Sequence, residues 1–402
     1  MVSGANGLAQ IILAVISVFV ARASTPTVFG TAMSAVALAL TLTALLDFGV
    51  TAQAVRQYAN GAWQPSEVQR RLGSKVATVL VASSVALLLS VIVGPSDIYM
   101  VVPAIAVGAV IGQVFKVPLQ AAAKSQFTGF ALIGDRVVLT LTTAILWASD
   151  VVAPSTALAI GFVTGPLAGA LISYGLTPSE WRVRPTFSLA HPWRGSRNFG
   201  LFGLAVSAQS LDLPVLALLA GPHAAGQYAA VQRWIAPMNL VTNAVSGTAV
   251  PFVAAAQSHR QASEVLRGSY KLLAFAALAC LAVAVSAPWL TTWVLGDMYA
   301  GSSSVLQLLA LSTTLAIFTQ PMAMFLMSRG RDAHVAAITV AGVAMQFMLL
   351  AVLAGPFAAD AAPLALCLTQ GALILGYGVA LRGLLRTELR RSGEMESDTW
   401  TH

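Results

Sequence analysis

Charged residues within or at the ends of long apolar stretches are the positions of this sequence where chemistry is expected first. A charge at the centre of a membrane helix costs roughly 2.5–3.5 kcal/mol even on lenient insertion scales, so each one needs a partner or a function. These residues are Arg22, Asp47, Asp135, Arg136, Asp212 and Arg233. Arginine binds phosphate oxygens bidentately and keeps its charge. We therefore expect the three arginines, together with Asp47, to line a hydrated cavity for an anionic or phosphate-bearing substrate. Arg22, at a helix end, has the alternative of reaching the membrane interface.

Asp212 has a different expected role, because it carries a carboxyl group. Burial in apolar surroundings disfavours the charged form of a carboxyl group, and Pro214 removes a backbone donor two residues later. We expect Asp212 to couple transport to a H⁺ or Na⁺ gradient. The alternative is an ion pair with Arg233 or Arg136 and a purely structural role. Asp135 and Arg136 are adjacent and point about 100° apart on a helix, so we do not expect them to neutralise each other.

Uncharged amides accompany these charges. They are Gln113, Gln120, Gln209, Gln232, Gln320 and Gln346. In a cavity they would form hydrogen bonds with sugar hydroxyls; the alternative is hydrogen bonding between helices.

The elements that hold these residues are predicted membrane helices. The chain has 402 residues, of which 57% are hydrophobic and 9% charged, whereas a soluble domain has roughly 25% charged residues. At roughly 20 residues per crossing, this composition predicts an all-α membrane protein of about twelve transmembrane helices. The expected spans are 5–22, 28–47, 75–94, 98–118, 126–148, 154–175, 199–220, 226–254, 271–295, 303–327, 334–355 and 361–383. No Lys or Arg precedes Arg22, so the first span lacks the basic start of a secretory signal.

The positions of the basic residues predict the orientation. Of the 22 Lys and Arg residues, all but Arg22, Arg136 and Arg233 fall in the segments after even-numbered spans. The other connections contain Asp97, Asp150, Asp297 and Asp360. Cytoplasmic loops are enriched in Lys and Arg, so both termini are expected in the cytoplasm. The net charge of +7 is thereby explained by topology, and no nucleic-acid partner is expected.

The chain also divides into two similar halves. Residues 1–176 form an expected six-helix lobe, 177–198 a cytoplasmic linker, 199–385 a second six-helix lobe and 386–402 a cytoplasmic tail. Gly30 and Gly226 follow similar Pro-containing turns in the two halves, 196 residues apart. Internal duplication around a central axis is common in secondary transporters. We therefore expect a central cavity between the lobes.

Enzymatic motifs are missing from the sequence. It contains no GxSxG, P-loop or HExxH pattern, and its five histidines are scattered. We expect neither catalytic residues, nor a bound metal, nor a cofactor.

A series of short motifs resembles those of a known transporter family. In order they are Ala21-Arg22-Ala23, Phe29-Gly30, Leu45-Leu46-Asp47-Phe48-Gly49, Ala54-Val55-Arg56, Val117-Pro118-Leu119-Gln120-Ala121 followed by Arg136, Leu211-Asp212, Ala220-Gly221-Pro222, Gly226-Gln227-Tyr228, Leu295-Gly296-Asp297-Met298-Tyr299-Ala300 and Ser328-Arg329-Gly330-Arg331. Their order resembles bacterial oligosaccharide (O-antigen/exopolysaccharide) flippases. These belong to the polysaccharide-transporter branch of the multidrug/oligosaccharidyl-lipid/polysaccharide exporter superfamily. Two departures are the short stretch before the first span and Ser24-Thr25-Pro26 in place of the commoner Leu-Gly-Pro.

The resemblance implies alternating access and the flipping of a polyprenyl-pyrophosphate-linked oligosaccharide for surface polysaccharide synthesis. It also implies that a polysaccharide polymerase and glycosyltransferases act as partners, in addition to membrane lipid. Two alternatives stay open. One is a cation-coupled multidrug exporter of the same fold, and the other is a non-transporting scaffold of a glycan-synthesis complex.

Overall fold

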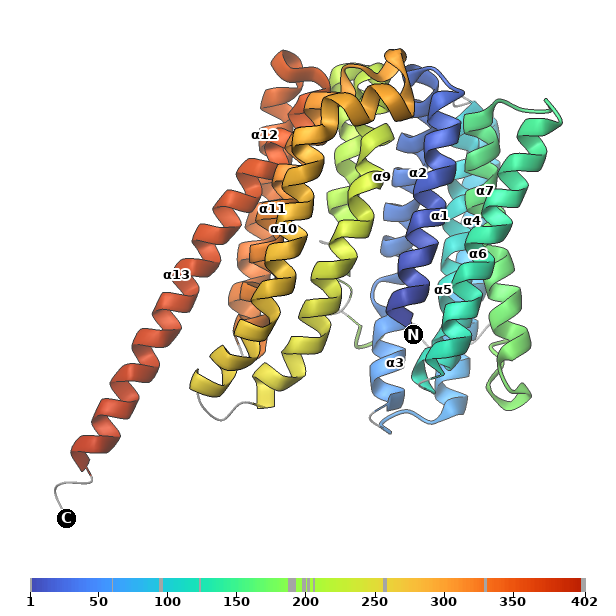
Figure 1. Ribbon diagram of the computed structural model, residues 1–402. Helices are drawn as coiled ribbons and strands as arrows, with labels where there is room; N and C mark the ends of the chain where they lie inside the picture. The colour runs from blue at the N-terminus through green and yellow to red at the C-terminus, as the bar shows by residue number, and fades with distance from the viewer. Residues whose placement is uncertain are drawn as a thin grey trace.

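The first half of the chain forms a bundle of helices. The computed structural model describes residues 2–59, 61–93, 97–122, 124–186, 193–196, 200, 203–204, 207–255, 259–328 and 331–398. The first bundle contains α1 (Val2–Arg22), α2 (Pro26–Asp47), α3 (Val50–Ala59), α4 (Pro65–Val93), α5 (Val102–Ala121), α6 (Ser125–Ala148) and α7 (Pro154–Leu176). They stand side by side on the right of Figure 1.

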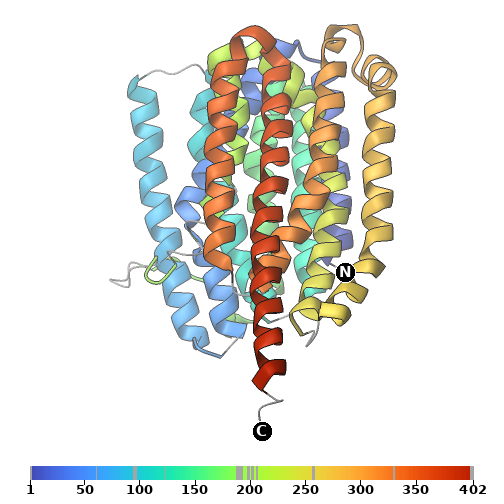
Figure 2. The same cartoon turned by 90° about the vertical axis from the view of Figure 1, so that its left-hand side faces the viewer.

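The second half forms another bundle, which is shown from its own side in Figure 2. It contains α9 (Asp212–Ala255), α10 (His259–Leu295), α11 (Ser302–Ser328), α12 (Asp332–Phe357) and α13 (Ala361–Asp398). The backbone of α9 is non-helical at Gly221, with φ 89° and ψ 163°, so this element comprises the end of one expected span and all of the next. The Gly-Pro turn expected between these spans is therefore confirmed.

The arrangement is that of a multi-pass membrane protein. Among the described residues, eight helical stretches are long and apolar enough to cross a membrane, and the last, Ala333–Leu384, includes both α12 and α13. Large apolar side chains point outward from both bundles; Leu171 of α7 is 74% exposed and Val285 of α10 is 83% exposed. A surface with so many exposed apolar groups requires lipid rather than water around it. The expected all-α fold of about twelve transmembrane helices in two lobes is confirmed.

Three boundaries differ from the expected ones. α3 was expected as loop, but its Val50 and Ala54 are buried while Arg56 is exposed, so it is a short amphipathic helix. α4 begins at Pro65, where proline suits the first turn of a helix, ten residues before the expected span. α13 continues to Asp398, through most of the segment expected as a tail.

The two lobes meet most closely at the upper end of Figure 1, where α1 turns into α2. A Cβ at Gly30 would overlap the carbonyl oxygen of Pro222, and a Cβ at Gly226 would overlap that of Pro26. The contact is thus reciprocal, with each glycine facing the proline that precedes its counterpart. The missing side chains allow α2 and α9 to cross backbone to backbone.

A second contact closes the same end. Tyr299, in the short turn after α10, is fully buried and donates a hydrogen bond to the carbonyl oxygen of Ser24 at 3.3 Å. Below this closed end, the helices of the two lobes diverge (Figure 1). The structure is therefore shut at the end where α1 meets α2.

The crossing of α2 and α9 predicts a stability effect. Replacing Gly30 or Gly226 by Ala should destabilise the closed arrangement by about 1–3 kcal/mol, because the added methyl group must push backbone apart. Gly175→Ala is the matched control, since nothing lies within 4 Å of a Cβ at that helical position. Thermal unfolding of the purified variants measures the difference. Equal melting temperatures for Gly30→Ala and Gly175→Ala would contradict the proposed close crossing.

Candidate functional site

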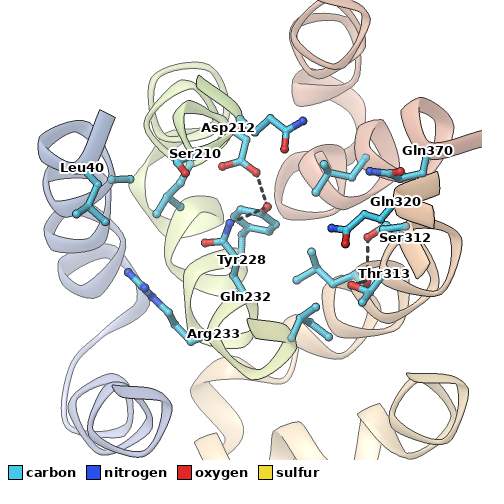
Figure 3. Close-up of a pocket in the computed structure, with 17 residues that line it drawn as sticks. Leu40, Ser210, Asp212, Tyr228, Gln232, Arg233, Ser312, Thr313, Gln320 and Gln370 are labelled. Atoms are coloured by element: carbon cyan, nitrogen blue, oxygen red, sulfur yellow. Dashed lines mark hydrogen bonds between the residues drawn. The ribbon is translucent and has the colours of Figure 1, made fainter. Parts of the chain in front are cut away.

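A central cavity lies below the closed end, between α2 of the first lobe and the second lobe (Figure 3). Its volume is about 450 Å³, which is within the usual size of ligand pockets. Its polar lining residues are Gln209, Ser210, Asp212, Tyr228, Gln232, Arg233, Ser312, Thr313, Gln320 and Gln370. Amides and hydroxyls are therefore the main polar groups of the wall.

Asp212 is the buried carboxylate of this wall. It is 3% exposed, and its Oδ2 accepts a 2.5 Å hydrogen bond from the hydroxyl of Tyr228. Gln232 donates in turn to the Tyr228 hydroxyl at 3.1 Å. The Oδ1 atom of Asp212 is buried and has no hydrogen-bond partner among the described residues. Asp212 thus pairs with Tyr228, and the described ion pairs do not join it to Arg233 or Arg136.

The backbone around Asp212 differs from expectation. Asp212 is the first residue of α9 and follows a single 3₁₀ turn, Gln209–Leu211. Pro214 consequently lies in the first turn of a helix, where its missing N–H breaks no hydrogen bond. The expected interruption at Pro214 is not present; the irregular backbone is the 3₁₀ turn before Asp212. Residues 207–208 before the 3₁₀ turn are also helical, so the backbone tightens locally beside the cavity.

Arg233 lies apart from Asp212 in the lining of the cavity. In Figure 3 its side chain extends toward α2, away from the pair of Asp212 and Tyr228. Its guanidinium lies 5.7 Å from the ring centroid of Phe162 in α7, within the range of a cation–π contact. Arg136 of α6 carries a charge of the same sign in the same lobe as Phe162. An arginine of the second lobe therefore reaches the first lobe.

Arg136 belongs to a buried charge cluster of the first lobe. Its Nη1 lies 3.5 Å from Asp135 Oδ1, and Lys116 Nζ lies 3.4 Å from Asp135 Oδ2. The expectation that Asp135 and Arg136 do not pair is wrong, because the long arginine side chain bends back to its neighbour. Gly165 and Gly169 of α7 pack directly on Asp135. Together with Arg233, the cluster has three cations and one carboxylate, so this side of the molecular centre is cationic.

Lys116 was expected in a cytoplasmic loop and not among the buried charges of the site. It lies within α5, and its side chain is 13% exposed. The available indication was its position inside the expected span 98–118. Tyr228, Ser312, Thr313 and Gln370 were also missed, because their hydroxyls and amide are common in membrane helices and only the packing of α9, α11 and α13 brings them together.

Arg136 is not among the residues that line the cavity, and neither are the other two expected site residues, Asp47 and Arg22. Asp47, at the end of α2, accepts hydrogen bonds from Gly49 N at 3.1 Å and from the Thr51 hydroxyl, and it pairs with the fully buried Lys75 of α4. It thereby joins α2, α3 and α4. Arg22 is exposed at the end of α1. Their part in substrate binding stays a prediction.

Only some of the amides that were expected in the cavity lie there. Gln209, Gln232 and Gln320 line the cavity, whereas Gln113 and Gln120 are exposed on α5. Gln346 is buried in α12, and neither polar atom of its side chain has a partner among the described residues.

Comparisons with known proteins match the structure but not the sequence. No family model and no curated protein matches the sequence. The lipid II flippase MurJ, in an inward closed conformation, superposes with a TM-score of 0.75 at 9% identity, over 95% of this chain and 87% of that chain. An inward-facing multidrug resistance MATE family transporter of the MOP superfamily superposes with a TM-score of 0.72 at 14% identity, over 95% and 96%.

A third solved structure bears on the conformation. An outward-facing multidrug resistance MATE family transporter superposes with a lower TM-score of 0.59, at 16% identity over 97% of this chain and 94% of that chain. The two-lobed fold of this chain is therefore that of MOP superfamily transporters. The inward-facing MATE structure superposes on this chain with a higher TM-score than the outward-facing one.

Proposed function

We propose that this protein flips a polyprenyl-pyrophosphate-linked oligosaccharide across the bacterial inner membrane by alternating access, for surface polysaccharide biosynthesis. The observation that carries the proposal is the division of the molecular centre into two chemically different sides. Arg233 extends from the cavity wall to Phe162 of the first lobe, and that lobe carries the buried charges of Lys116 and Arg136 around Asp135. Hydroxyls and amides of α9, α11 and α13 line the other wall.

The two sides fit the two polar parts of such a substrate. A pyrophosphate is multiply charged, and the planar guanidinium binds its oxygens bidentately in a site with little water. Sugar hydroxyls need both donors and acceptors, which Gln320, Gln370 and Ser312 supply. Since the arginines come from different lobes, a bound phosphate would bridge the lobes and be released when they separate.

The similar structures support this class of function. They include a lipid II flippase as well as multidrug transporters, and the sequence motifs resemble oligosaccharide flippases. The proposed partners are the lipid-linked substrate, membrane lipid, and the polymerase and glycosyltransferases of the same process. The direct test is transfer of a polyprenyl-pyrophosphate oligosaccharide between leaflets of vesicles containing the purified protein. No transfer above protein-free vesicles would refute it.

A multidrug exporter of the same fold is the second candidate, and Asp212 favours it. A buried carboxylate on a cavity wall suits a cationic drug or a coupling ion. The two functions differ in the role of the arginines, since neutralising Arg233 should weaken binding of an anionic substrate and strengthen binding of a cationic one. Efflux of a cationic dye by the same vesicles, enhanced in Arg233→Ala, would support the exporter.

The proposed orientation places both termini in the cytoplasm and the closed end outside. In a variant without Cys280 and Cys367, a cysteine replacing the exposed Asp297 should react with an impermeant thiol reagent in intact cells. A cysteine replacing the exposed Ala62, between α3 and α4, should react only after permeabilisation. Labelling of the Ala62 position from outside would reverse the orientation.

A further inference from the structure

The connection after α7 forms a groove on the lower end of the first lobe. Its short turn at Ser179–Trp181 is attached to α4 by a hydrogen bond from the Gln69 side chain to the carbonyl oxygen of Glu180. The N–H of Thr186 donates to the carbonyl oxygen of Gly73 at 3.2 Å. A Cβ at Gly73 would overlap the backbone of the connection, so residues 179–186 lie directly on α4. The groove is therefore fixed at both ends.

The groove is basic. It has a volume of about 520 Å³, and its charged lining residues are Arg70, Arg182, Arg184 and Glu180; the rest of its lining is hydroxyl and amide groups. Arg70 pairs with Glu67 at 2.5 Å. Arg182 uses its Nε to donate to the carbonyl oxygen of Thr177 at 3.0 Å, which fixes the side chain and leaves its terminal nitrogens for a ligand. Arg184 is exposed.

The groove adjoins the membrane-facing surface of α7. The guanidinium of Arg182 lies 4.9 Å from the ring centroid of Tyr174, in the last turn of this helix. On either side of Tyr174, Leu171 is 74% exposed and Leu176 37% exposed. Tyrosine at the end of a membrane helix marks the headgroup level of the bilayer. The arginines therefore lie where the apolar surface of the helix ends.

We propose that this groove binds the headgroup of an anionic phospholipid of the cytoplasmic leaflet. Guanidinium groups supply phosphate contacts, the hydroxyl and amide groups suit the polar part of a glycerol headgroup, and the exposed leucines contact the acyl chains. This site is separate from the central cavity and does not depend on the transported substrate. The bound phospholipid holds residues 179–186 against α4.

Native mass spectrometry of the full-length protein in a detergent with an uncharged headgroup tests the proposal, with phosphatidylglycerol as the probe and phosphatidylcholine as the reference. In the double variant Arg182→Gln, Arg184→Gln, the tightest phosphatidylglycerol binding should weaken about tenfold or more, since each basic residue near an anionic surface contributes severalfold. Phosphatidylcholine binding should not change. Lys124→Gln is the matched control, because Lys124 is exposed at the same end, outside the groove.

Two further measurements distinguish a phospholipid site from a site for a free anion and from the absence of a site. Arg184→Gln alone removes an exposed side chain without disturbing the contact of Arg182 with Tyr174, and it should still weaken phosphatidylglycerol binding severalfold at an unchanged melting temperature. Unchanged phosphatidylglycerol binding in both groove variants overturns the proposal. Inorganic phosphate that binds as tightly as phosphatidylglycerol also overturns it, since the groove would then be a site for a free anion.

Discussion

Replacing Arg136 or Arg233 by Ala should lower the rate of lipid-linked oligosaccharide transfer by about 10- to 100-fold, the range expected for loss of a charge-assisted hydrogen bond. The protein should remain folded. Arg233 lies in none of the described ion pairs, and removal of Arg136 leaves Asp135 its contact with Lys116. Neither change therefore creates a buried carboxylate without a cationic neighbour. Transfer is measured in vesicles, and abundance and melting temperature are measured alongside it.

The choice of replacement shows which property of the arginines matters. Lysine keeps the charge but lacks the planar fork, so it should restore transfer only in part. Arg382→Ala is the matched control, because Arg382 is an exposed arginine of α13 away from the cavity. If both Ala variants transfer the substrate like the unmodified protein, the cationic site is wrong, and a scaffold role or a different substrate becomes the better explanation.

The fold could be predicted because membrane helices depend on local composition. A run of about 20 apolar residues has to form a helix in lipid, and the kink at Gly221 followed from a Gly-Pro pair between two such runs. α3 could not be found in this way. It owes its helical form to the packing of Val50 and Ala54 against α4 and α5, a contact between segments that no local pattern contains.

The site could be predicted only in part, for a related reason. The cost of charge in lipid singled out Arg136, Asp212 and Arg233 as residues, but not their partners. Tyr228 is the partner of Asp212, although it lies 16 residues later in the chain and on the other side of the turn at Gly221. Lys116 became part of the cluster because α5 packs beside α6. Partners of buried charges are set by tertiary packing, and one sequence does not specify them.

Asp212→Asn should abolish the dependence of transport on an imposed H⁺ or Na⁺ gradient while leaving substrate binding intact. Asparagine keeps the shape of the side chain and can still accept the hydrogen bond of Tyr228, but it can neither take up a proton nor neutralise a sodium ion. The free Oδ1 of Asp212, buried on the cavity wall, is the atom on which either ion would act. The measurement is transport in vesicles with and without each gradient.

Tyr228→Phe separates this role from a structural one. If the hydrogen bond between Asp212 and Tyr228 only fastens the start of α9 to the rest of that helix, its removal should cost about 1.5–3 kcal/mol of stability. Tyr228→Phe would then be at least as unstable as Asp212→Asn, with transport falling in proportion to abundance in both. If Asp212 is instead the coupling residue, Tyr228→Phe keeps the carboxyl group and should still respond to the gradient. Asp212→Asn should not respond, even at normal abundance. A gradient response that survives in Asp212→Asn would end the coupling proposal, because no other described carboxyl group lines this cavity.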